Sequence, residues 1–196
     1  MTDLRSVTVY CGSNAGADPA YAEATRSLAR LLVDSDVRIV YGGASLGLMG
    51  VLADTALEAG GDVIGIMPQA LIDREIGHRG LKDLRVVSSM HERKALMAEL
   101  SDGFIALPGG IGTLEELIEV YTWSQLGIHR KPLGVLNVNG YYDSLAAFLD
   151  DAVDARFLPA QHRDVLIFEP DPETLLARMA GAQTPTASKW LTEAET

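Results

Sequence analysis

The stretch Gly103–Glu116, GFIALPGGIGTLEE, joins two kinds of secondary structure. The apolar run Gly103–Leu107 predicts a buried β-strand, and the pattern LEELIEVYTWSQL predicts a helix over Thr113–Leu126. Three glycines lie between the strand and the helix, so the turn carries little side chain. A strand that passes through glycines into a helix is the repeating unit of parallel α/β sheets, and it leaves bare backbone N–H groups at the start of the helix.

The same alternation of apolar runs and helical patterns extends along most of the chain. Most runs are continuously apolar, which is typical of strands covered on both faces, so we expect a doubly wound parallel sheet in a three-layer α/β/α arrangement. Residues 1–180 are expected to form one nucleotide-binding domain, followed by a mobile tail over 181–196. The other predicted strands are Ser6–Cys11, Val37–Tyr41, Asp62–Met67, Leu84–Val87, Leu133–Val138 and Val165–Phe168. The other predicted helices are Pro19–Asp34, Gly47–Ala59, Ser89–Ser101, Tyr142–Ala155 and Pro172–Ala180.

Composition restricts the classes of function. The formal net charge of −11 argues against a general nucleic-acid or anionic membrane surface. Cys11 is the single cysteine, which excludes an intrachain disulfide framework, and no cluster of metal ligands is apparent. The chain starts without a signal-peptide pattern and has no apolar run long enough to span a membrane. We therefore expect a cytoplasmic protein that has no metal site.

Three glycine-containing turns are expected at one edge of the sheet, because every strand-to-helix turn of a parallel sheet lies at its carboxyl edge. They contain Gly12 and Ser13, then Gly42 and Gly43, and finally the turn quoted above. None matches a Walker A loop, and no acid follows the second turn at the position that would hold a dinucleotide ribose. A nucleoside monophosphate therefore fits this edge better than a dinucleotide.

The acids after the third turn have two readings. Thr113 and Glu116 have the spacing of a capping box, in which the threonine caps the helix and the glutamate reaches back to its N–H group. Acids in a first helical turn are also favoured by the helix dipole. Spacing alone leaves the choice between a cap and a catalytic carboxylate open.

A second group of residues opens the helix predicted after Leu84–Val87. Ser89 and Glu92 form another potential capping box. Arg93 and Lys94 then place two cations near a helix N-terminus, where the dipole disfavours positive charge. This placement favours an anionic partner, and a solvated helix face is the alternative.

The two groups together resemble the Lonely Guy family. Pro108–Glu116, PGGIGTLEE, matches its PGGxGTxxE motif, Met90–Lys94, MHERK, is similar to its second motif, and the resemblance runs from about Val7 to Met179. It implies a Rossmann-like homodimer that hydrolyses cytokinin riboside 5′-monophosphates to free base and ribose 5-phosphate, without a cofactor. Many members are labelled lysine decarboxylases, which would imply pyridoxal phosphate, but no lysine here is in a setting that clearly suits a Schiff base.

The resemblance also implies the roles of individual residues. Arg93 and Glu116 would be catalytic, with the Glu116 carboxylate stabilising positive charge on the ribose. Glu115 would be a neighbour that is either solvated or supports the residues that contact the substrate. The role of Arg93 stays open between binding phosphate, orienting Glu116 and assisting departure of the base. The expected substrate-binding residues are Gly12, Ser13, Gly42, Gly43, Glu75, Met90, Arg93, Lys94, Gly109, Gly110, Ile111, Gly112, Thr113, Glu115, Glu116 and Thr122.

Three further expectations concern substrate and assembly. A broader nucleosidase that acts on AMP and a non-catalytic nucleotide-binding module remain alternatives. Base preference is open, because the stretch after Glu75 lies in a region expected to vary. Val120, Tyr121, Trp123 and Leu126 put bulky apolar groups on more than one face of their helix, which is consistent with a two-fold dimer. A helix buried within a monomer is the alternative.

Overall fold

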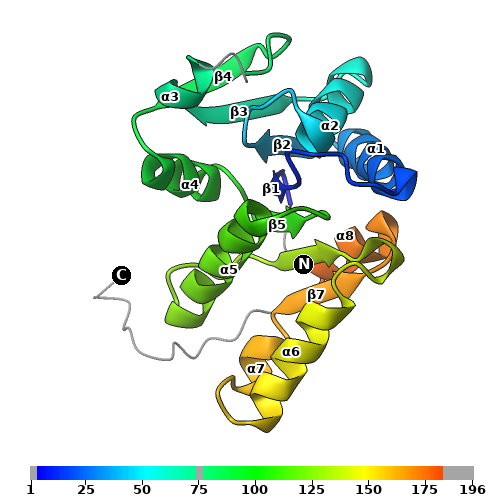
Figure 1. Cartoon of the computed structure of the whole chain (residues 1–196), viewed down its shortest axis with the longest axis vertical. Helices are drawn as coiled ribbons and strands as arrows, with labels where there is room; N and C mark the ends of the chain where they lie inside the picture. The colour runs from blue at the N-terminus through cyan, green and yellow to red at the C-terminus, as the bar shows by residue number, and fades with distance from the viewer. Residues whose placement is uncertain (1–3, 74–76, 183–196) are drawn as a thin grey trace.

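The computed structural model, which describes residues 4–73 and 77–182, contains one seven-stranded parallel sheet (Figure 1). The strand order is β4-β3-β2-β1-β5-β6-β7. The chain moves outward from β1 to β4 and then returns to the other side of β1 with β5, so the switch point of this doubly wound sheet lies between β1 and β5. The strands are β1 Ser6–Tyr10, β2 Arg38–Tyr41, β3 Val63–Pro68, β4 Asp83–Val87, β5 Gly103–Ala106, β6 Leu133–Leu136 and β7 Leu166–Glu169.

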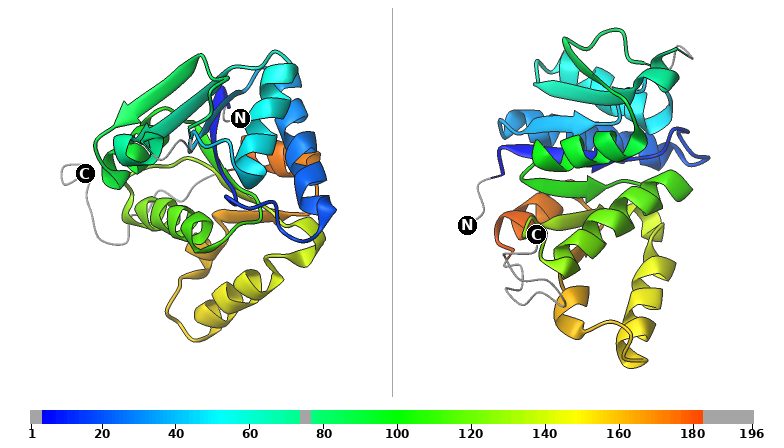
Figure 2. Two further views of the ribbon diagram at one scale, coloured as in Figure 1. Left: turned by 45° about the horizontal axis from the view of Figure 1, so that its top comes forward. Right: turned by 90° about the vertical axis from the view of Figure 1, so that its left-hand side faces the viewer.

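Helices cover both faces of the sheet and complete three layers (Figure 2). On one face Leu28, Leu52 and Leu175 pack from α1, α2 and α8. On the other face Met97 and Leu117 pack from α4 and α5, together with apolar residues of α6. The helices are α1 Pro19–Asp34, α2 Gly47–Glu58, α3 Gln69–Ile72, α4 Met90–Glu99, α5 Ile111–Leu126, the 3₁₀ turn η1 Val138–Gly140, α6 Asp143–Asp154, α7 Ala160–Arg163 and α8 Pro172–Ala180.

The sequence predictions of strands and fold class are confirmed, but one helix start is wrong. The helix α5 begins at Ile111 instead of Thr113, with Gly110 as its N-cap in an extended conformation. Thr113 is therefore the third helical residue, and Glu116 lies beyond the first turn. The predicted capping box of Thr113 and Glu116 does not form, because Thr113 already has helical backbone and α5 has no side-chain cap hydrogen bond.

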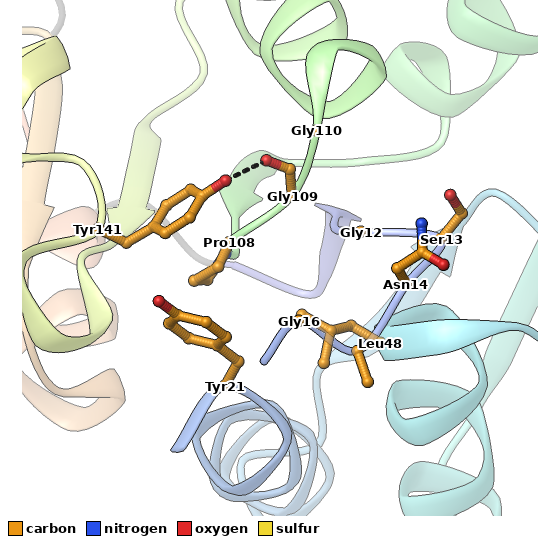
Figure 3. Close-up of a pocket in the computed structure, with 11 residues that line it drawn as sticks. Gly12, Ser13, Asn14, Gly16, Tyr21, Leu48, Pro108, Gly109, Gly110 and Tyr141 are labelled. Atoms are coloured by element: carbon orange, nitrogen blue, oxygen red, sulfur yellow. Dashed lines mark hydrogen bonds between the residues drawn. The ribbon is translucent and has the colours of Figure 1, made fainter. Parts of the chain in front are cut away.

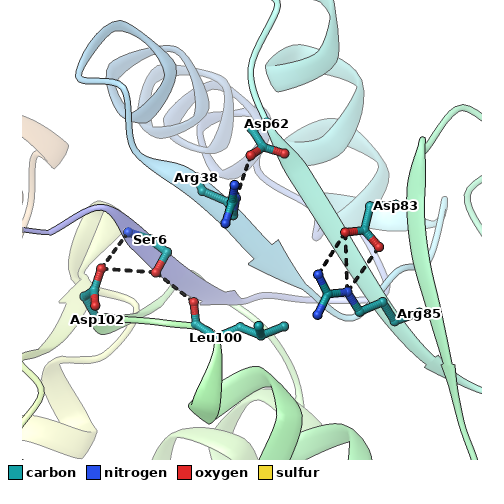
Figure 4. Close-up of polar contacts among 7 residues, drawn as sticks. All are labelled: Ser6, Arg38, Asp62, Asp83, Arg85, Leu100 and Asp102. Atoms are coloured by element: carbon teal, nitrogen blue, oxygen red, sulfur yellow. Dashed lines mark hydrogen bonds and ion pairs between the residues drawn. The ribbon is translucent and has the colours of Figure 1, made fainter.

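Polar contacts hold the amino edge of the sheet together (Figure 4). The Asp102 carboxylate, just before β5, accepts hydrogen bonds from the backbone N–H of Arg5 and from both the N–H and the hydroxyl of Ser6. Arg38 at the start of β2 binds Asp62 just before β3, and Arg85 binds Asp83 within β4. These polar groups of the amino edge thus find their partners within the chain. No helix in the described part of the chain is long and apolar enough to cross a membrane.

Candidate active site

The three glycine turns meet at the carboxyl edge of the sheet, as the sequence predicted. The N–H of Gly12 donates to the carbonyl of Pro108 at 3.1 Å, and its carbonyl accepts from Leu48 N at 3.0 Å. A methyl group on Gly12 would lie 3.3 Å from the Cα of Gly109, and one on Gly47 would lie 2.3 Å from the carbonyl carbon of Ser13. Backbone therefore packs directly on backbone where the turns converge, which requires the small residues at Gly12 and Gly47.

Two other glycines of the third turn face open space. Nothing lies within 4 Å of a methyl group placed on Gly110 or Gly112, and Ile111 between them is 82% exposed. Gly109 is different, because a methyl group there would lie 2.1 Å from the hydroxyl of the buried Thr113. The N-terminal N–H groups of α5 are thus uncapped by any side chain and accessible, which is the arrangement that binds phosphate groups at helix N-termini.

A pocket of about 260 Å³ opens beside this helix start (Figure 3). Tyr141 forms one wall, and its hydroxyl donates to the carbonyl of Gly109 at 2.5 Å. The Tyr21 ring from α1 packs edge-on against Tyr141, with ring centroids 5.6 Å apart. Gly110, the N-cap of α5, also borders the pocket, so a group held at the helix start faces this space. The lining residues are Gly12, Ser13, Asn14, Ala15, Gly16, Tyr21, Leu48, Pro108, Gly109, Gly110 and Tyr141.

Arg93 and Glu116 meet across α4 and α5. Arg93 Nη2 lies 3.6 Å from Glu116 Oε1, and the two side chains are 10% and 13% exposed. The Arg93 guanidinium packs over Gly42, where a methyl group would lie 2.0 Å from Nη2. Its Nη1 contacts the sulfur of Met90 at 3.7 Å, and its buried Nε has no hydrogen-bond partner among the described residues. The guanidinium therefore keeps donor capacity for a ligand.

The environment of Glu116 changes its acidity. Burial raises the pKa of Glu116 above its ordinary value, and the negative charges of Glu115 and Glu119 act in the same direction, while Arg93 and Lys94 oppose them. Burial likewise raises the pKa of Cys11 and of Tyr10, and the Glu116 charge adds to both. A carboxylate near two cations and out of water is a candidate catalytic group on physical grounds.

Lys94, the neighbour of Arg93, is held by two carboxylates of α5. Its Nζ lies 2.5 Å from Glu115 Oε1 and 3.0 Å from a carboxylate oxygen of Glu119. Burial lowers the pKa of Lys94, but the hydrogen bonds to Glu115 and Glu119 outweigh burial and leave that pKa raised. The predicted anionic partners of this cation are thus within the chain itself. The alternative of a solvated helix face is wrong, because Arg93 and Lys94 are both buried.

The predicted site residues divide into three groups. The three turns, Met90, Arg93, Lys94, Glu115 and Glu116 lie at or beside the carboxyl edge, and Gly43 has the positive φ of 77° that glycine tolerates. Thr122 does not join these residues within a single chain. It is exposed and lies about 9 Å further along α5 than Glu116. Its hydroxyl donates to Ile118 O. Glu75 and most of the predicted tail lie outside the described residues.

Several residues near this edge were not predicted from the sequence. Tyr10 was visible only as part of an apolar run, although strand alternation places its side chain on the α4 and α5 face. Glu119 lies one helical turn from Glu115, so helical spacing could have identified it as a second partner of one cation. Tyr21 and Tyr141 are 120 residues apart in sequence, and no local signal predicts that they line one pocket.

The chain is similar to one family model and to several curated plant proteins of one kind. Residues 49–179 match the family model described as "Possible lysine decarboxylase". A cytokinin riboside 5′-monophosphate phosphoribohydrolase of Arabidopsis thaliana is 48% identical over 176 residues, which cover 90% of this chain and 77% of the relative. One from Oryza sativa subsp. japonica is 46% identical over 90% of this chain and 73% of its own length.

Solved structures extend the likeness to the fold. The molybdenum cofactor binding protein of Rippkaea orientalis aligns with a TM-score of 0.68 at 19% identity, covering 92% of this chain and 98% of that chain. The molybdenum cofactor carrier protein of Chlamydomonas reinhardtii aligns with a TM-score of 0.67, also at 19% identity, over 89% and 95% of the two chains. At this level of identity the likeness concerns the Rossmann-like three-layer architecture alone.

The MHERK and PGGIGTLEE motifs therefore lie at the starts of two helices whose side chains meet at Arg93 and Glu116. The curated relatives match this chain over nine-tenths of its length, across both motifs. The chain belongs to the Lonely Guy family, the cytokinin riboside 5′-monophosphate phosphoribohydrolases.

Proposed function

We propose that this chain hydrolyses the N-glycosidic bond of cytokinin riboside 5′-monophosphates and releases free cytokinin base and ribose 5-phosphate. The observation that carries the proposal is the buried Arg93–Glu116 pair next to the open N-terminus of α5. An anion site and a carboxylate thus lie close together, as hydrolysis of a phosphorylated nucleoside requires. The curated relatives are named for this activity, which supports the substrate class.

The phosphate is assigned to the start of α5. Gly110 and Gly112 leave room for its oxygens, and the uncapped N–H groups of the first turn point toward an anion in this position. Arg93 and Lys94 together face Glu115, Glu116 and Glu119, so their charges are more than offset by carboxylates. The helix N-terminus is therefore the main attraction for phosphate.

Glu116 is assigned to the sugar. Breaking the N-glycosidic bond builds positive charge on the ribose, as in other glycosyl transfers with an oxocarbenium-like transition state. An ionised carboxylate stabilises that charge and orients the water that adds to the anomeric carbon. The base departs with the electron pair of the bond, and the proton that the water loses balances the one that the base takes up. The free donors of Arg93 are available to the substrate, and its ion pair fixes the orientation of Glu116.

Amino-acid decarboxylation through pyridoxal phosphate does not fit this site. Lys94 is the lysine that lies at the Arg93–Glu116 pair among the described residues. A lysine that forms a Schiff base needs a lowered pKa, whereas the pKa of Lys94 is raised and its ammonium is bound by two carboxylates.

A panel of substrates tests the proposal. The parent protein is incubated with isopentenyladenosine 5′-monophosphate, its riboside and AMP, and released base and ribose 5-phosphate are measured. We expect cleavage of the prenylated monophosphate and a loss of about tenfold or more for the riboside, the effect of losing a charged hydrogen bond. Equal efficiency on the riboside contradicts the phosphate assignment. Equal efficiency on AMP indicates a general nucleosidase, and binding without product indicates a binding module.

We also propose that the chain forms a homodimer through the outer face of α4 and α5. Ile118 and Ile128 are 38% and 48% exposed, and an apolar hollow of about 510 Å³ lies between these helices. Its walls include Ala95, Phe104 and Trp123. Of the four apolar residues that suggested a dimer, Val120 and Tyr121 are buried within the chain, so the outer face depends on the others. A light-scattering mass near 21.0 kDa at micromolar concentration contradicts a stable dimer.

A further inference from the structure

Two adjacent cations of α4 have opposite surroundings. Arg93 keeps an unpartnered buried Nε and a long contact of 3.6 Å to Glu116. Lys94 instead has short contacts of 2.5 Å to Glu115 and 3.0 Å to Glu119, and its side chain is only 8% exposed. An ammonium group has three donors, and two of them are directed at carboxylates of α5. Lys94 therefore has little capacity left for a substrate phosphate.

The contacts form a ladder between the two helices. Arg93 faces Glu116, and the next residue, Lys94, faces the preceding residue, Glu115. These positions are consecutive on both helices. The Lys94 contacts therefore fix how α4 is aligned along α5, and this alignment places Arg93 opposite Glu116. Glu119 adds a contact one helical turn further along α5.

We propose that Lys94, Glu115 and Glu119 form a positioning device, the Lys94 clamp, which holds Arg93 against Glu116 and sets the charge around Glu116 without touching the substrate. The inference rests on the proposed function, in which Arg93 and Glu116 act on the glycosidic bond. It removes Lys94 from the predicted substrate ligands and gives Glu115 a partner within the chain, while the Glu115 side chain stays 53% exposed.

The clamp has an electrostatic consequence for Glu116. The groups that face it are Arg93 and Lys94 from α4, Glu115 and Glu119 from α5, Tyr10 from β1, and Cys11 directly after β1. Lys94 lowers the pKa of Glu116 and Glu119 raises it. Loss of the lysine charge should therefore move the acid limb of kcat/KM to higher pH, and loss of the Glu119 charge should move it to lower pH. A lysine that only supports the fold predicts no such opposed pair of shifts.

The test compares Lys94→Met, Glu119→Gln and Lys94→Arg with the parent on isopentenyladenosine 5′-monophosphate. We expect Lys94→Met to lower kcat by about tenfold or more while KM changes by less than about threefold. Its acid limb should move to higher pH, and that of Glu119→Gln should move to lower pH. Lys94→Arg can contact both carboxylates, so it should restore most of kcat, and it serves as the folded variant if Lys94→Met does not fold.

Two outcomes overturn the clamp. One is a KM that rises about tenfold or more in Lys94→Met with kcat retained, because that pattern belongs to a residue that binds the phosphate. The other concerns the Glu116 pKa, measured by NMR titration of the carboxyl group. If this pKa is the same in the parent, in Lys94→Arg, in Glu119→Gln and in a folded Lys94→Met, the charges of Lys94 and Glu119 do not act on Glu116. The titration needs no turnover. A parent that releases no ribose 5-phosphate contradicts the proposed function but leaves this measurement to decide on the clamp.

Discussion

The N-termini of α4 and α5 carry the same sequence signature and fold differently. Ser89 accepts a hydrogen bond from Glu92 N at 3.1 Å, and the Glu92 carboxylate accepts from Ser88 N at 2.7 Å, so the start of α4 is closed by its own side chains. Thr113 and Glu116 have the same spacing, yet α5 begins two residues earlier and receives no side-chain cap. One helix start is capped by its own side chains, and the other leaves its N–H groups uncapped for a ligand.

The difference shows how small a change separates a cap from a binding site. In α4 a serine occupies the N-cap position, whereas in α5 glycine occupies it. Glycine at the N-cap supplies no acceptor, and the threonine that could supply one is already inside the helix with its hydroxyl against Gly109. The carboxylate at Glu116 is thereby released from the role that Glu92 performs and is free to pair with Arg93.

The largest expected effect comes from Glu116→Gln. The glutamine keeps the size of the side chain and removes its charge, so we expect turnover of a cytokinin ribotide to fall by about a hundredfold or more. The melting temperature should stay within about 2 °C of the parent, because no cap is lost. Glu58→Gln, which removes an exposed carboxylate at the end of α2, is the matched control. Turnover within a few-fold of the parent would show that Glu116 does not stabilise the sugar cation.

Gly110→Asp should convert the open helix start into a closed one. The position has a φ of −89° and no neighbour within 4 Å of a methyl group, so the backbone tolerates a side chain. The new carboxylate accepts from the first N–H groups and repels phosphate, and we expect KM for the monophosphate to rise by about tenfold or more. Gly110→Ala, which adds no acceptor, should raise KM much less. An equal rise for the riboside would mean that the variant damages the site in another way.

Ser89→Ala should open the closed helix start. Loss of an N-cap hydroxyl costs about 1 kcal/mol in the free energy of unfolding, which corresponds to a melting temperature about 2–4 °C lower in a chain of this size. Ser89→Asn retains a capping oxygen and should recover most of the loss. Chemical unfolding of the three proteins checks this order, and an unchanged stability in Ser89→Ala would show that the Ser89 hydrogen bond contributes nothing.

The smallest expected effect is a pH dependence of the closed helix start. The hydrogen bonds from Ser88 lower the pKa of Glu92 below its ordinary value of 4.5. A carboxyl group with a lowered pKa in the folded state stabilises the protein above its unfolded pKa and loses this contribution as pH falls through the folded pKa. The melting temperatures of Glu92→Gln and the parent should thus differ near neutral pH and converge as pH falls through the lowered pKa of Glu92. A difference that persists unchanged in acid contradicts this origin.

Local pattern was sufficient to predict the sheet. All seven strands were expected from short apolar runs, because burial on both faces leaves continuous runs in the sequence. The convergence of the glycine turns also followed, since parallel strands place all their carboxyl ends on one edge. The start of α5 did not follow, because a glycine N-cap and a threonine cap are both compatible with the sequence.

The contacts that define the site could not be obtained from spacing. Arg93 and Glu116 lie on separate helices, and which residue of α5 faces which residue of α4 depends on how both pack on the sheet. Lys94 was expected to bind an anion, and two carboxylates of its own chain bind it instead. The wall formed by Tyr141 requires a third segment that follows β6, and only the folded chain brings it to Gly109.

The central place of β1 has a consequence for the order in which the chain assembles during synthesis. Ser6–Tyr10 emerges before the other strands of the sheet and can pair with β2 once Arg38–Tyr41 has emerged. Its other neighbour is β5, with Val7 opposite Gly103. Until β5 is made, the nascent sheet presents one edge of an entirely buried strand, SVTVY, to its surroundings. About half of the chain is therefore made while this strand edge is unpaired. Such an unpaired edge can pair with another copy of the chain during synthesis or refolding.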